Sequence, residues 1–78
     1  MNNLRRKQIT EVKTKIKDLL EELQTLQEEE QDYFDNMPEN LQYSEKGQKA
    51  EETANDLQNV IDNIDSELDE LENIISRN

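Results

Sequence analysis

Apolar residues recur along this chain at alternating spacings of three and four positions, in two stretches of nearly equal length. In the first stretch, position a of a seven-residue repeat holds Ile9, Ile16 and Leu23, and position d holds Val12, Leu19, Leu26 and Tyr33. In the second stretch, position a holds Ala54, Ile61, Leu68 and Ile75, and position d holds Ala50, Leu57, Ile64 and Leu71. Such spacing gathers apolar side chains on one helix face, which must be buried. The pattern predicts two amphipathic helices that pack through positions a and d.

Capping residues and helix breakers place the ends of these two helices. We expect the first helix over about residues 4–34, with Asn2 or Asn3 as its N-cap, and the second over about residues 45–76, with Ser44 as its N-cap. Helices of equal length joined by a short connector pack antiparallel. The sequence therefore predicts one domain, residues 1–78, with an all-α fold: an antiparallel two-helix coiled-coil hairpin.

The connector, residues 35–43, is the most distinctive segment of the chain. Pro38 lacks a backbone donor, so the first helix should end before it and a short helical turn should begin there. A solvated loop would be polar, but this one carries Met37, Leu41 and Tyr43. We expect these three to form a lid over Tyr33 and Phe34 at the end of the first helix. At this end of the hairpin the predicted neighbours across the seam are Tyr33 with Gly47 and Leu26 with Ala54.

Charge is distributed unevenly and supports the antiparallel pairing. The chain carries 20 acidic and nine basic residues, a formal net charge of −11. Residues 5–17 hold six bases and one acid, whereas residues 18–35 hold eight acids and no base. In an antiparallel pair the basic segment meets the acidic second helix. The predicted neighbours are Arg6 with Glu72, Lys13 with Asp65, and Lys15 with Glu67. Glu30 at position a is expected to reach water beside Ala50.

Additional apolar residues widen both stripes beyond a two-helix seam. They are Leu20 and Phe34 at position e, and Val60 and Ile74 at position g. A hairpin alone would leave these side chains partly exposed, whereas two hairpins packed together would cover them. The sequence therefore predicts a homodimer or higher homo-oligomer, with a four-helix bundle as its form and these four residues at the interface.

The residue types argue against an enzyme and against a built metal or cofactor site. Cysteine and histidine are absent, and Gly47 is the one glycine, so thiolate and imidazole chemistry and a glycine-rich phosphate loop are excluded. The acidic cluster of Glu28, Glu29, Asp32 and Asp35 lacks the loop and glycine of a calcium site. No apolar run is long enough to cross a bilayer, and the negative charge disfavours nucleic acid and anionic membrane. We expect a cytoplasmic protein.

The acidic surface instead suits a protein partner with a basic surface. Rows of carboxylates on a helical rod can imitate a nucleic-acid backbone, although acidic coiled coils are also common for solubility alone. The candidate partner-binding residues are Glu21, Glu22, Glu28, Glu29, Asp32, Asp35, Met37, Leu41 and Tyr43. Two alternatives remain: a structural coiled-coil assembly component, and an oligomer that sequesters a nucleotide through the basic stretch of Arg5, Arg6, Lys7, Lys13, Lys15 and Lys17.

The connector and its flanks, from Phe34 to Gly47 (FDNMPENLQYSEKG), resemble a segment of small helical proteins of phages and prophages of Gram-positive bacteria. There it joins a charged helix to one rich in Ile, Asp and Glu; the first helix is too generic to add to the likeness. The resemblance implies a helical hairpin acting in the host cytoplasm, and it implies no catalytic or cofactor-binding residue. Small acidic phage proteins often bind host machinery, so it also implies an inhibitor of a nucleic-acid-binding or defence protein.

Overall fold

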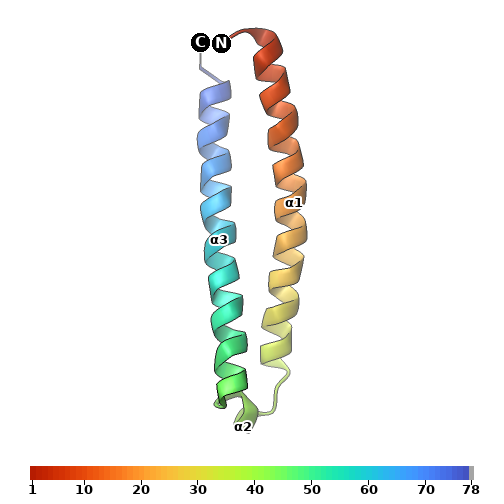
Figure 1. Ribbon diagram of the computed structural model, residues 1–78, viewed down its shortest axis with the longest axis vertical. Coiled ribbons are helices and arrows are strands. Elements are labelled where there is room, and N and C mark those ends of the chain that lie inside the picture. Colours follow the sequence, from red (N-terminus) through yellow and green to blue (C-terminus); the bar gives the residue numbers. More distant parts are fainter. Residues whose placement is uncertain (78) are drawn as a thin grey trace.

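The computed structural model, which describes residues 1–77, is an elongated helical hairpin (Figure 1). Helix α1 spans Asn3–Asp35, the short helix α2 spans Glu39–Gln42, and helix α3 spans Glu45–Ile75. The two long helices run antiparallel, so the start of α1 and the end of α3 lie together and α2 lies at the opposite end. The hairpin measures 58 × 16 × 12 Å along its principal axes. The predicted all-α hairpin is confirmed.

Side-chain caps begin both long helices where the sequence predicts them. The Asn2 side chain accepts a hydrogen bond from the Arg5 backbone N–H, at 2.7 Å. The Ser44 hydroxyl accepts one from the Gly47 N–H, at 3.3 Å. Each cap satisfies a backbone donor that has no partner within its helix. Pro38 immediately precedes α2, so the predicted short turn after the proline is also present.

The core between α1 and α3 is thin. In the described part of the chain, the buried apolar residues are Ala50, Ala54, Ile61 and Leu68, all on α3, and two of them are alanines. Gly47 is buried on the same line of α3. Of residues 3–35, only Gln27 is buried, and its side-chain amide donates to the Ala54 carbonyl at 3.2 Å. Small residues on α3 thus allow α1 to approach closely, while α1 fills the space with partly exposed side chains.

Helix α1 is rotated about its axis relative to the prediction. Its position-d residues were expected in the seam, but Val12, Leu19, Leu26 and Tyr33 are 52%, 63%, 56% and 46% exposed. The seam is formed instead by position a together with position e, where Arg6, Lys13, Leu20, Gln27 and Phe34 are at least half-buried. The prediction that α1 packs on α3 through a and d is therefore wrong for d. Positions a and e also alternate by three and four, so they form an equally valid helical stripe.

The pairing of the two helices differs from the predicted one, and the difference is larger at the open end of the hairpin than near the loop. Lys13 forms an ion pair with Glu72, not with Asp65, and its Nζ lies 2.5 Å from the Glu72 Oε2. Arg6 donates to the backbone carbonyl of Arg77 rather than to Glu72. Near the loop, Gln27 and not Leu26 contacts Ala54.

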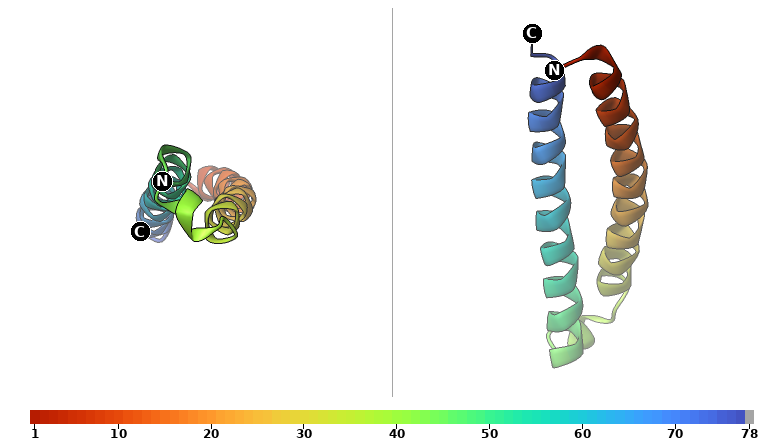
Figure 2. Two further views of the ribbon diagram at one scale, coloured as in Figure 1. Left: turned by 90° about the horizontal axis from the view of Figure 1, so that it is seen from below. Right: turned by 45° about the horizontal axis from the view of Figure 1, so that its top comes forward.

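The connector packs tightly against the start of α3 (Figure 2). A Cβ atom on Gly47 would lie only 2.5 Å from the carbonyl oxygen of Gln42, so glycine is required by this close approach. The Gln42 side chain donates to the carbonyl of Phe34 at 3.2 Å and ties α2 to the end of α1. The predicted lid is only partly present: Met37 is half-buried, whereas Tyr43 is 74% exposed and covers nothing.

Candidate protein-interaction surface

One side of the hairpin carries an exposed apolar row from α1 beside exposed and half-buried apolar side chains from α3, and we call this side the apolar face. From α1 it contains Val12, Leu19, Leu26 and Tyr33, and from α3 it contains Val60, Ile64, Leu71 and Ile74. The four α1 residues recur every seven positions, so they lie along one line of the helix. Contiguous exposed apolar surface of this kind typically marks an interaction site.

Two connected hollows join the contributions of the two helices on this side. The first is lined by Ile16, Leu19, Leu20, Leu23 and Ile64, all apolar. The second has a volume of about 380 Å³ and extends along α3 past Leu71 and Ile74, with Glu67 and Glu70 among its lining residues. Ile16 and Ile64 line both hollows. The apolar face is therefore one grooved surface that spans both helices.

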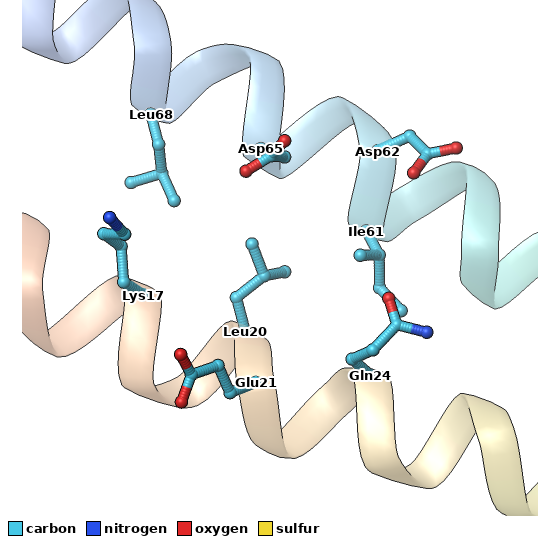
Figure 3. Close-up of a pocket in the computed structure, with 8 residues that line it drawn as sticks. All are labelled: Lys17, Leu20, Glu21, Gln24, Ile61, Asp62, Asp65 and Leu68. Carbon is cyan, nitrogen blue, oxygen red and sulfur yellow. The ribbon is translucent and has the colours of Figure 1, made fainter.

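The opposite side of the seam is polar (Figure 3). A groove of about 310 Å³ has Leu20, Ile61 and Leu68 at its base and Lys17, Glu21, Gln24, Asp62 and Asp65 around it. Leu20 points from α1 toward α3 between Ile61 and Leu68. Beside this groove the Gln24 amide donates to the side-chain oxygens of Gln27 and Gln58. The two sides of the hairpin thus differ sharply in polarity.

The residues predicted at an oligomer interface are divided between the two environments. Leu20 and Phe34 lie half-buried at position e, where α1 faces α3 of the same chain. Val60 is 48% exposed and Ile74 is half-buried, and both lie on the apolar face. The sequence pattern predicts the position-d row of α1 in the hairpin seam, whereas the structure leaves it exposed. The signal for this surface was that apolar residues recur at positions a and d and also occur at e, as Leu20 and Phe34, which is more than one neighbouring helix can cover.

The predicted partner-binding acids are all at the surface. Glu21, Glu22, Glu28, Glu29, Asp32 and Asp35 are exposed. Within residues 1–77 the ion pairs are Lys13–Glu72 and Lys49–Glu45, so none of these six acids takes part in one. Of the three connector residues, Met37 and Leu41 line a shallow hollow with Tyr33 and Lys46, while Tyr43 lies outside it. The structure therefore does not gather all nine residues into one site.

The basic segment of α1 is partly used within the hairpin. Lys13 and Arg6 both contact the end of α3. The hydrogen bond and positive charge of Lys13 hold the pKa of the Glu72 carboxyl below its ordinary value, with smaller contributions from a hydrogen bond to Ser76 and the charge of Lys17. Two of the cations available for a nucleotide are thus already engaged by the chain's own second helix.

Searches of the described residues for other kinds of site give negative results. Among residues 1–77, no group of three His, Cys, Asp or Glu side chains is placed to hold a metal ion. Over the same residues, no helix has the length and apolar character needed to cross a membrane. Comparisons with protein-family models, curated proteins and solved structures found no match to this chain.

Proposed function

We propose that this protein is a non-enzymatic helical assembly module that self-associates through the apolar face, with a four-helix bundle as the assembled form. The observation that carries the proposal is the exposed position-d row of α1, which continues across the groove onto α3. A helix whose position a is flanked by an exposed apolar row at d on one side and by a neighbouring helix at e on the other suits two neighbours. Within the hairpin α1 has one such neighbour, and a second hairpin would supply the other.

The surface area of the isolated hairpin supports self-association. The chain has a mass of 9.3 kDa and an accessible surface of 6005 Å². A compact monomer of this mass exposes about 5,000 Å². The excess of roughly 1,000 Å² is comparable with the 800 Å² or so that each partner buries in a standard protein interface. Burying the apolar face against a second copy would bring the exposed area per chain close to that of an ordinary globular protein.

The thin core supports the same proposal. Chains shorter than about 80 residues rarely gain enough stability from a single core, and they commonly use disulfides, metals or a partner subunit. This chain has no cysteine, and its buried apolar residues include only two large side chains among residues 1–77. Association would add Leu19, Leu26 and their neighbours to the core and raise the stability of each hairpin.

Sedimentation equilibrium tests the proposal directly. The unmodified chain is expected to sediment as a dimer at micromolar concentrations, and Leu19→Glu is expected to shift it to the monomer because it places a charge in the apolar face. Thr25→Glu is the matched control, since it adds the same charge to an exposed position of the same helix. Circular dichroism would show that both variants remain helical. A monomer for the unmodified chain at all accessible concentrations would contradict the proposal.

A second function is favoured by a different observation, the six exposed acids of α1 that form no ion pair within residues 1–77. In this alternative the chain binds the basic surface of a nucleic-acid-binding or defence protein in the cytoplasm of a bacterial host, as the resemblance to phage proteins implies. Such binding would weaken steeply with salt. It would also be lost when Glu28, Glu29 and Asp32 are replaced by Gln or Asn, changes that should leave self-association intact.

A further inference from the structure

Building on the self-association proposed above, we infer that the occupant of the apolar face is a second copy in the opposite orientation, with the two connectors at opposite ends of the bundle. In this arrangement α1 lies against α1 of the second copy. A two-fold axis passes near Leu19, so that Leu19 meets its own counterpart and Val12 lies opposite Leu26 of the second copy. The contact is thus apolar, and it requires the two copies to be antiparallel.

The charge order along α1 favours antiparallel over parallel packing of α1 on α1. The six bases of residues 5–17 are followed by the eight acids of residues 18–35. Two α1 helices side by side in the same direction would place base on base and acid on acid, which is repulsive along the whole contact. With the axis at Leu19, residues 5–17 lie opposite residues 21–33 of the second copy. That segment holds six acids, which balance the six bases.

The charged residues that border the exposed row also favour the antiparallel arrangement of the two α1 helices. Position g of α1, on the outer margin of the apolar face, holds Lys15, Glu22 and Glu29. In an antiparallel helix pair, g positions lie opposite g positions. The axis at Leu19 therefore brings Lys15 next to Glu22 of the second copy, and symmetry forms this pair twice. Within residues 1–77 neither residue forms an ion pair in the hairpin itself.

The other charges that border the apolar face belong to α3. Its margin carries Glu67 and Glu70. In the antiparallel arrangement α3 lies against α3 of the second copy, so these charges lie outside the α1–α1 contact. A copy turned end for end with α1 against α3 would instead join residues 18–35 to the acidic second half of α3, which is repulsive.

Cysteine cross-linking tests the orientation, because the chain has no native cysteine. A disulfide requires Cα atoms within about 7 Å. The variant Leu19→Cys should therefore form a disulfide-linked dimer with itself on mild oxidation. Val12→Cys and Leu26→Cys should each stay unlinked alone, because two copies of Leu26 would lie about 21 Å apart along the bundle. A mixture of these two variants should cross-link.

The outcomes separate the orientation from self-association itself. Self-linking by all three single variants would place the copies parallel and overturn this inference, while the assembly function would stand. A dimer in sedimentation with no cross-link at any of these positions would show that α1 does not face α1, and it would also overturn the inference. A monomer, or a monomer that binds only a different protein through this face, would overturn both proposals.

Charge exchange provides an independent readout. Lys15→Glu and Glu22→Lys should each weaken dimerisation, on the order of tenfold, because each replaces two attractive pairs by two repulsive ones. The double variant, Lys15→Glu with Glu22→Lys, should recover most of the original affinity, since the pair is restored with its signs reversed. Single variants with unchanged affinity, or a double variant weaker than both, would overturn the proposed contact.

Discussion

The two long helices of this hairpin use their apolar residues in different ways. Helix α3 directs its buried row toward α1 and includes Gly47, Ala50 and Ala54, which permit close approach. Helix α1 directs polar side chains such as Lys13 and Gln27 toward α3 and leaves its most regular apolar row exposed. The buried row of α3 is therefore used within the hairpin, whereas α1 has an additional apolar face available for a partner.

The largest change in the free energy of unfolding is expected when α3 loses a large buried side chain. Ile61→Ala should lower the free energy of unfolding by roughly 2–5 kcal/mol, because it leaves a cavity in an already thin core. Val12→Ala on the exposed row of α1 should have a smaller effect that grows with protein concentration, since that row contributes through association. Urea unfolding followed by circular dichroism at several concentrations measures both. If both variants lost the same free energy of unfolding at low protein concentration, the buried row of α3 and the exposed row of α1 would contribute equally to the hairpin itself.

The next largest effect is expected at the start of α3, where the connector touches the helix. Gly47→Ala should destabilise the hairpin by about 1–3 kcal/mol, because the added Cβ meets the backbone carbonyls of Leu41 and Gln42. This loss outweighs the gain of about 1 kcal/mol that alanine brings to a helix. Glu51→Ala, one turn later and exposed, is the control. Thermal unfolding measures both variants, and a higher midpoint temperature for Gly47→Ala than for the unmodified chain would contradict the close approach.

A smaller effect is expected from the one buried residue of residues 3–35. Gln27→Ala removes the hydrogen bond to the Ala54 carbonyl and a partner of Gln24, and it should lower the free energy of unfolding by about 1–2 kcal/mol. Gln8→Ala, at an exposed position of the same helix, should change it by less than about 0.5 kcal/mol. Urea unfolding of the two variants side by side checks the prediction. Equal stability would place Gln27 outside the seam.

The smallest effect concerns the ion pair at the open end of the hairpin. The pKa of Glu72 is lower in the folded chain than its ordinary value of 4.5, chiefly because of the hydrogen bond from Lys13. The stability that it contributes is therefore fully present above pH 4.5 and is lost as the pH falls through the lower folded-state value. Glu72→Gln and Lys13→Gln should both reduce the dependence of the free energy of unfolding on pH below 4.5, as measured by urea unfolding at several pH values. Lys49→Gln, whose ion pair lies within one helical turn, is the control.

Much of the local structure could be predicted from the sequence. Asn2, Pro38 and Ser44 mark the beginnings of the three helices because capping and the missing proline donor depend on neighbouring residues only. The antiparallel pairing was also predictable, since a short connector leaves two long helices no other economical arrangement. The exposed acids of the second half of α1 followed from their spacing.

The pairing of the helices could not be derived in the same way. Lys13 meets Glu72 rather than Asp65, and both residues are acids on the same helix, so charge complementarity does not distinguish the two pairings. Position a of α3 lies in the seam in either pairing, so the apolar pattern does not distinguish them either.

The ends of the helices, their antiparallel pairing and the apolar residues of α1 at a, at d and in part at e all follow from the amino-acid sequence. Which of these positions face α3 is set by the packing of the two helices. Rows a and d and rows a and e both have the spacing of a helical stripe, so no local property distinguishes them. The choice depends on contacts between residues distant in sequence, such as Gln27 with Ala54, and it leaves Leu19 and Leu26 exposed for a partner.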